Sequence, residues 1–135
     1  MYEIMVEDTF ASAHQLKGYD GPCENLHGHT WKVQVFLSGD KLNETGMLFD
    51  FKTAKAALKD ILFEFDHKNL NEMEMFTCSN PTAENIARVI FGKFNDKINE
   101  MGNNVGSRHG GTARGVILSN VTVWESERTC ATYRS

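Results

Sequence analysis

A short run of the chain holds one thiol and two imidazoles: residues 23–29 are Cys-Glu-Asn-Leu-His-Gly-His. Side chains two residues apart on a strand face the same side, so His27 and His29 can converge on one ion. His14 ends the preceding extended segment, and the loop between is long enough to make the two segments neighbours. Three neutral imidazoles suit zinc and leave a fourth position for substrate or water. The alternative interpretation is that these are ordinary surface or loop histidines.

Cys23 is the second candidate for chemistry, because it lies four residues before His27 and a loop that reaches the metal also carries its thiol. Near a dication and imidazoles, the pKa of a thiol falls below its usual value of about 8.5, and the thiolate can then act as a base. The alternative is a small buried hydrophobic residue. That plainer interpretation is preferred for Cys78 and Cys130, which have no such surroundings.

Two acidic positions complete the set of candidates. Asp66 directly precedes His67, and a carboxylate that orients an imidazole forms an acid–base unit. Equally, Asp66 can bond to a helix end and His67 can be an exposed helix-terminal cation. Glu125 shares strand parity with Val121 and Val123, where a carboxylate is costly unless it has a partner. Its partner can be a ligand with two adjacent N–H groups; alternatively, the strand has ended and Glu125 is solvated.

The elements that must position these residues follow from hydrophobic periodicity. Alternation predicts strands over 2–13, 29–37 and 116–124, with a short fourth strand after Cys130. Helical spacing predicts one helix that Asp50 caps and that runs to about residue 65. A second helix is expected to start at Asn80-Pro81, with proline at its first position. The order ββααββ indicates an α+β fold with antiparallel strands.

Length and composition restrict the class of protein. The 135 residues suit one domain, 1–135, and no apolar run approaches the roughly 20 residues that span a bilayer. A net charge of −4 and a pI near 5.7 argue against nonspecific nucleic-acid binding. The N-terminus lacks a signal-peptide profile, and the three cysteines form no CxxC pair. We therefore expect a cytoplasmic protein with no membrane partner.

In combination these motifs resemble the 6-pyruvoyltetrahydropterin synthase / 6-carboxytetrahydropterin synthase family. The resemblance covers nearly the whole chain in order, and the combination is more specific than any single motif. The matching positions are His14, CxxxHGH at 23–29, Asp50-Phe51, Asp66-His67-x-x-Leu70-Asn71, Pro81-Thr82-x-Glu84-Asn85-Ile86 and Val123-Trp124-Glu125-Ser126.

The resemblance implies a tunnelling fold, in which an antiparallel sheet carries two helices on one face. Subunits of this family pool their strands into a barrel and stack as homo-oligomers, often hexamers, with sites between subunits. The implied substrate is 7,8-dihydroneopterin triphosphate, and the implied cofactor is a single Zn²⁺ in each subunit.

The residue roles that the resemblance implies are as follows. His14, His27 and His29 match the zinc ligands, and Cys23 matches the proton acceptor. Asp66 and His67 match the acid–base relay. Glu125 matches the acid that anchors the pterin ring and is coupled to the relay, and Thr82 matches a pterin-contacting threonine.

The expected reaction is that of a 6-carboxytetrahydropterin synthase on the queuosine precursor route, with loss of acetaldehyde and triphosphate. One alternative is the 6-pyruvoyl product, formed by triphosphate elimination alone. Glu24 gives the sequence ExxHGH, which in a related subgroup accompanies cleavage to a 6-hydroxymethylpterin, so dual activity is a further alternative. An exposed Glu24 without a role is slightly preferred to that last alternative.

Two non-enzymatic alternatives also stand. One is a pterin- or metal-binding module, which has no need of Cys23 with Asp66-His67; the other is a structural zinc protein, with Cys23 closing the site. Residues 101–115 are rich in Gly and Asn and predict a long loop. Its Arg108, His109 and Arg114 can contact the triphosphate, although a solvated loop is the preferred interpretation.

Overall fold

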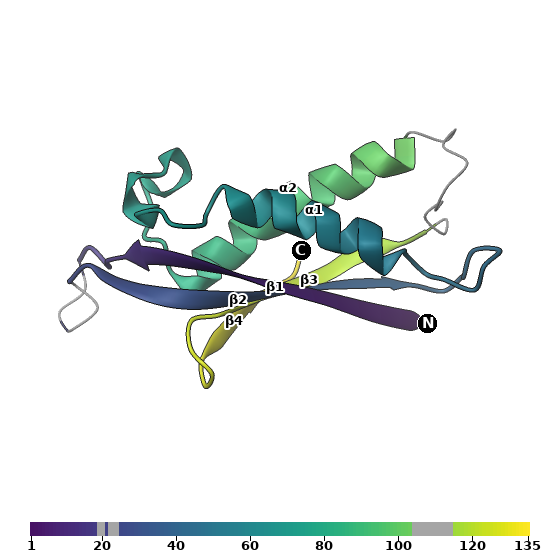
Figure 1. The fold of residues 1–135 in the computed structure, drawn as a ribbon, viewed down its shortest axis with the longest axis horizontal. Coiled ribbons are helices and arrows are strands. Elements are labelled where there is room, and N and C mark those ends of the chain that lie inside the picture. The colour runs from purple at the N-terminus through teal and green to yellow at the C-terminus, as the bar shows by residue number, and fades with distance from the viewer. Residues whose placement is uncertain (19–20, 22–24, 104–114) are drawn as a thin grey trace.

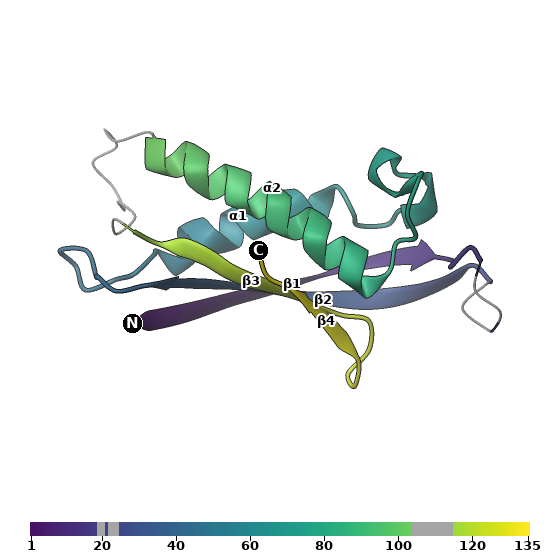
Figure 2. The ribbon, with the colours of Figure 1, turned by 180° about the vertical axis from the view of Figure 1, so that it is seen from behind.

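One antiparallel sheet carries two helices on a single face in the computed structural model, which describes residues 1–18, 21, 25–103 and 115–135. The strand order is β1-β2-β3-β4, and Figures 1 and 2 show α1 and α2 on the same side of the sheet. The elements are β1 (Tyr2–His14), β2 (His27–Gly39), α1 (Phe51–Phe63), η2 (Leu70–Glu72), η3 (Glu74–Phe76), α2 (Ala83–Asn103), β3 (Ile117–Trp124) and β4 (Cys130–Tyr133). The predicted order ββααββ is confirmed, with two short 3₁₀ turns added between the helices.

Strands β1 and β2 pair along their whole length, from Tyr2 opposite Gly39 to His14 opposite His27. The predicted start of β2 at His29 is therefore two residues too late. Gly28 is a poor strand former by propensity, but its pairing with Ala13 keeps the chain extended. Consequently both histidines of the HGH run lie on the strand, next to the end of β1.

The core lies between the sheet and the two helices. α1 packs over β1, while α2 packs over β3 and β4. The apolar rows expected on β2 and on both helices are fully buried, as the alternation and helical spacing predicted. These buried residues include Trp31, Val33, Val35, Leu37, Ala54, Leu58, Ile61, Leu62, Ile86, Ile90, Phe94 and Ile98.

The start of α1 agrees with the sequence prediction, because an oxygen of Asp50 accepts a hydrogen bond from the Lys52 amide at 3.1 Å. The end does not: α1 stops at Phe63, although Phe65 beyond it is still buried in the core.

The predicted start of α2 at Asn80-Pro81 is wrong, since the helix begins at Ala83. Thr82 provides the cap instead, accepting a hydrogen bond from the Asn85 amide at 3.2 Å. Asn80 cannot cap the helix because its side-chain oxygen accepts from the Lys17 amide at 2.9 Å. Pro81 thus remains outside the helix, and its carbonyl is available to a side chain.

At its far end α2 extends to Asn103, into the segment predicted to be a loop. Arg108, His109 and Arg114 of that segment lie outside the described residues. Within the described part of the chain, no helix is both long enough and apolar enough to cross a membrane.

Candidate metal centre

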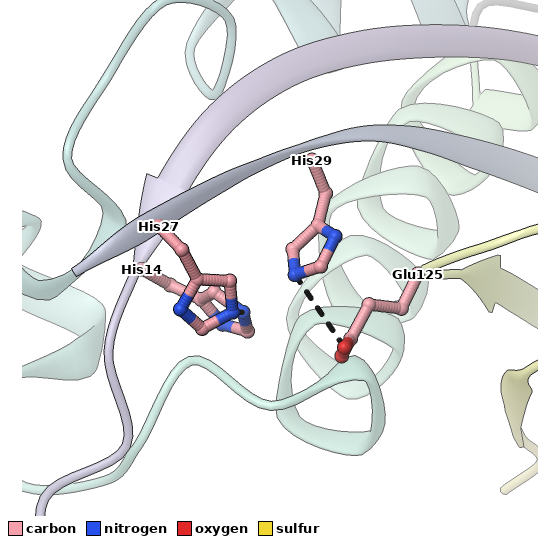
Figure 3. Close-up of side chains that lie close together, drawn as sticks. All are labelled: His14, His27, His29 and Glu125. Carbon is pink, nitrogen blue, oxygen red and sulfur yellow. Dashed lines mark hydrogen bonds and ion pairs between the residues drawn. The ribbon is translucent and has the colours of Figure 1, made fainter. Parts of the chain in front are cut away.

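Three histidines and one glutamate converge at one end of the sheet (Figure 3). His14 closes β1 directly opposite His27, the first residue of β2, and His29 follows two residues along β2 on the same face. Glu125 comes directly after β3. One potential ligand atom from each of the four side chains lies within 4.8 Å of all the others. Strand pairing and strand parity thus place the three predicted zinc ligands together.

Backbone carbonyls fix the orientation of two of the imidazole rings. The Nδ1 atom of His14 lies 2.8 Å from the carbonyl oxygen of Pro81, and Nδ1 of His27 lies 2.6 Å from that of Asn25. A carbonyl only accepts, so each Nδ1 carries the hydrogen and each neutral ring presents an Nε2 lone pair. A carbonyl partner on the other ring nitrogen is the usual way in which a protein orients a metal-binding histidine.

The two Nε2 atoms of His14 and His27 lie 3.0 Å apart. Two facing lone pairs have no hydrogen to share when both rings are neutral, whereas a cation between them satisfies both. Tetrahedral zinc with bonds of about 2.0–2.1 Å places its ligand atoms roughly 3.3 Å apart. The observed separation is close to that value, so this pair of rings fits one metal ion.

His29 supplies the third nitrogen. Its Nε2 atom is buried and has no hydrogen-bond partner among the described residues. A carboxylate oxygen of Glu125 lies 3.4 Å away, within ion-pair range. A buried polar atom without a partner costs free energy, and a metal ion removes that cost. The donor set of three imidazoles and one carboxylate is therefore one that zinc accepts.

Burial also favours the neutral, metal-binding form of these rings. Desolvation lowers the pKa of His14, although its bond to the Pro81 carbonyl opposes the shift. Desolvation likewise lowers the pKa of His29, with the negative charge of Glu125 in opposition. Metal binding requires deprotonated imidazoles, so the protein prepares these two rings for it.

The Asp66-His67 pair forms as expected, but on the edge of β1 that faces away from β2. The Ala11 amide donates to a carboxylate oxygen of Asp66 at 2.9 Å, and the His67 amide donates back to the Ala11 carbonyl. The other Asp66 oxygen lies 2.8 Å from Nδ1 of His67. His67 has a left-handed backbone with φ of 55° and a largely exposed ring. Neither residue belongs to the group of potential metal ligands.

Hydrogen bonding keeps Asp66 ionised. The Ala11 amide is the main cause of the lowered pKa of Asp66, and the hydrogen bond with His67 acts in the same direction. An ionised carboxylate that holds Nδ1 fixes the orientation of the largely exposed His67 ring and leaves its Nε2 for another partner.

Residues 3–135 match the sequence model of a family described as 6-pyruvoyl tetrahydropterin synthase. The chain belongs to this family. It is 37% identical to a 6-carboxy-5,6,7,8-tetrahydropterin synthase of Haemophilus influenzae, over 69% of this chain and 82% of the relative. It is 36% identical to a dihydroneopterin monophosphate aldolase of Pyrococcus furiosus, over 62% of this chain and 67% of the relative. A solved structure of 6-pyruvoyl tetrahydropterin synthase from Caenorhabditis elegans superposes with a TM-score of 0.77, at 25% identity, covering 99% of this chain and 95% of that one.

Membership of this tetrahydropterin synthase family confirms the resemblance and the tunnelling fold expected from the sequence. Of the other predicted site residues, Thr82 caps α2 and directly follows Pro81, whose carbonyl oxygen accepts from Nδ1 of His14. Cys23 and Glu24, the proposed base and its neighbour, lie outside the described residues.

No sequence signal pointed to two parts of the centre, the carbonyl oxygens of Asn25 and Pro81. A backbone carbonyl has no residue type of its own, so only the fold could bring these two atoms to the histidines. The nearness of Glu125 to His29 did have a signal, namely its parity with the buried Val121 and Val123.

We expect His27→Ala to lose the metal, because the change removes one of the two facing Nε2 atoms and leaves the other alone. Metal analysis of the purified variant, reconstituted with zinc and desalted, measures the outcome. His67→Ala is the matched control, since it removes an imidazole from the edge of β1 and should retain zinc. Stoichiometric zinc in the His27 variant would contradict the ligand assignment.

We also expect the stability that Asp66 provides to depend on pH. Its pKa is lowered in the folded state, so its contribution is complete above the unfolded value of about 3.9 and disappears as the pH falls through the folded value. Urea unfolding of the metal-free protein should show Asp66→Asn less stable than the parent at pH 6, with the difference shrinking below about pH 4.

Asp66→Ala separates the charge of Asp66 from its hydrogen bond to Ala11. Asparagine can still accept from the Ala11 amide, whereas Asp66→Ala cannot, so the alanine variant should be the less stable of the two at pH 6. A difference between the parent and Asp66→Asn that stays constant down to pH 3 would show that the charge of Asp66 does not contribute.

Proposed function

We propose that the protein is a zinc-dependent 6-carboxytetrahydropterin synthase. It converts 7,8-dihydroneopterin triphosphate to 6-carboxy-5,6,7,8-tetrahydropterin, with loss of acetaldehyde and triphosphate. The observation that carries the proposal is the pair of Nε2 atoms of His14 and His27, which face each other at 3.0 Å with both Nδ1 atoms held by carbonyls. The similarity to the Haemophilus influenzae synthase supports the choice of product.

Zinc would be held by His14, His27 and His29, and would stabilise the negative charge that develops on the substrate side-chain oxygens. Moving a proton from a carbon that bears a hydroxyl is difficult because the resulting enediolate is charged. Cys23, four residues before His27 in the chain, would take that proton as a thiolate.

Asp66 and His67 would complete proton transfer in a neighbouring subunit. Within one chain the pair lies at the edge of β1 that faces away from β2, outside the group of potential metal ligands. An exposed His67 ring held by an ionised Asp66 can serve a metal centre of a second copy placed beside that edge. A homo-oligomer with sites between subunits, such as a hexamer built from trimers, therefore suits this arrangement better than a monomer.

Substrate binding would use groups next to the metal. Thr82 and Glu125 are proposed to contact the pterin, and Glu125 is also coupled to proton transfer. The side chain of Glu125 lies beside His29, at the rim of the histidine cluster. A carboxylate here can accept hydrogen bonds from two adjacent N–H groups of a pterin ring.

Two other products remain alternatives. The 6-pyruvoyl product has the support of the structural similarity to the Caenorhabditis elegans enzyme. Cleavage to a 6-hydroxymethylpterin through Glu24 has the support of the similarity to an aldolase of Pyrococcus furiosus. A binding module without catalysis is a further alternative, but it does not explain the ionised Asp66 that orients an exposed imidazole.

Incubation of the zinc-loaded protein with 7,8-dihydroneopterin triphosphate, followed by mass spectrometry of the products, separates these outcomes. We expect 6-carboxytetrahydropterin, acetaldehyde and triphosphate together. A 6-pyruvoyl product without acetaldehyde, or a 6-hydroxymethylpterin without the 6-carboxy product, would replace the proposed activity by one of the alternatives. No turnover of the substrate would favour the binding module.

Cys23→Ala should retain zinc and lose at least ~100-fold in turnover, as expected when a proton-transfer group is removed. Cys78→Ala is the matched control, because Cys78 is an exposed free thiol remote from the HGH run in the sequence, and it should turn over like the parent. Metal analysis and the rate of product formation are measured on the same preparations. Unchanged turnover in the Cys23 variant would remove this thiol from the mechanism, and loss of zinc would make it a ligand instead.

A further inference from the structure

Glu125 differs from the three histidines in how the fold holds it. His14, His27 and His29 stand on β1 and β2, where every residue of β1 has a cross-strand partner. Glu125 follows the last residue of β3, and its amide donates to the Thr129 carbonyl at 3.1 Å across a turn. Its side chain points from this turn toward His29 (Figure 3), with about 30% of its surface exposed. The carboxylate is therefore attached to a turn, whereas the three imidazoles are attached to paired strands.

The distances place this carboxylate within reach of the same ion as the histidines. An oxygen of Glu125 lies 3.4 Å from Nε2 of His29, and the Nε2 atoms of His14 and His27 lie 3.0 Å apart. Two ligand atoms on tetrahedral zinc lie roughly 3.3 Å apart, so both separations match an edge of one tetrahedron. All four ligand atoms lie within 4.8 Å of one another. Shortening a separation of 4.8 Å to roughly 3.3 Å takes a movement of about 1.5 Å, which a side chain on a turn can supply.

The unsatisfied atoms of these groups also favour a bound cation. Nε2 of His29 is buried and makes no hydrogen bond within the described residues, including none to Glu125. The buried Nε2 atom and the carboxylate oxygen 3.4 Å from it are two potential ligand atoms that a cation can satisfy together. One dication in contact with all four groups satisfies the two histidine lone pairs, the orphaned Nε2 and the carboxylate together.

We propose that Glu125 is the fourth protein ligand of the metal in the substrate-free protein. This inference rests on the proposed zinc site but not on the identity of the reaction. Four protein ligands close a zinc site, as in structural centres, whereas a catalytic centre keeps one position exchangeable. Glu125 meets both conditions, because a carboxylate on a turn can leave the ion while the strand-borne histidines remain. The pterin ring can then donate its hydrogen bonds to the Glu125 carboxylate, which is already beside the metal.

Zinc affinity provides the first test. Competition with a chromophoric chelator, on apo-protein titrated with zinc alone, should show at least ~10-fold weaker binding for Glu125→Gln than for the parent. Glu127→Gln is the matched control, since Glu127 is exposed in the same turn, and its affinity should equal that of the parent. Equal affinity of Glu125→Gln and the parent would overturn the proposal.

A crystal structure of the zinc-loaded, substrate-free protein provides the second test, and it excludes a purely electrostatic effect of Glu125. We expect an oxygen of Glu125 at about 2.0–2.2 Å from zinc. A water in the fourth position, with the carboxylate beyond bonding distance, would overturn the proposal even if Glu125→Gln weakened zinc binding. Neither measurement uses turnover, so a failure of the proposed synthase activity would be seen separately from a failure of this inference.

Discussion

The pairing of β1 with β2 is the interaction on which the rest of the site depends. The register is continuous from Tyr2 opposite Gly39 to His14 opposite His27. Because side chains alternate between the two faces of a strand, a slip of one residue would turn His14 away from His27 and Phe10 away from the core. The buried stack of Phe10 on Trp31 therefore fixes the same register that brings the three histidines together. The hydrophobic core thus specifies the geometry of the site, and Trp31 packs against the rings of His14 and His29.

Strand β1 positions two different chemical groups, because it lies at the edge of the sheet and only one of its sides is used for pairing with β2. One side pairs with β2 and delivers His14 to the metal centre. The other side binds the segment after α1: Ala11 holds both Asp66 and His67, and the Ala13 amide donates to the Lys68 carbonyl at 3.0 Å. One edge strand thus positions both the histidine cluster and the Asp66-His67 pair.

The sequence predicted most of the fold and the convergence of the three histidines, for identifiable physical reasons. Strand parity placed His27 and His29 on one side, and strong alternation in β2 marked the buried row from Trp31 to Leu37. Local signals failed where tertiary contacts decided the outcome. Pairing with β1 extended β2 through Gly28, and a bond to the Lys17 amide removed Asn80 as a cap for α2.

The carbonyl oxygens that fix the imidazoles could not be predicted, because a backbone atom carries no information in the residue type. Pro81 illustrates the limit. Its residue type suggested the first position of a helix, whereas its functional atom in the structure is the carbonyl that accepts from His14. Proline still has a physical reason to stand there: its fixed φ holds the chain rigid just before Thr82 caps the helix.

The start of α2 and the orientation of His14 are therefore set by the same two residues, so the packing of α2 on the sheet and the geometry of the metal centre are coupled. Movement of α2 along the sheet would shift the Pro81 carbonyl that orients His14. The geometry of the centre therefore also depends on the packing of Ile86, Ile90 and Phe94 in the core.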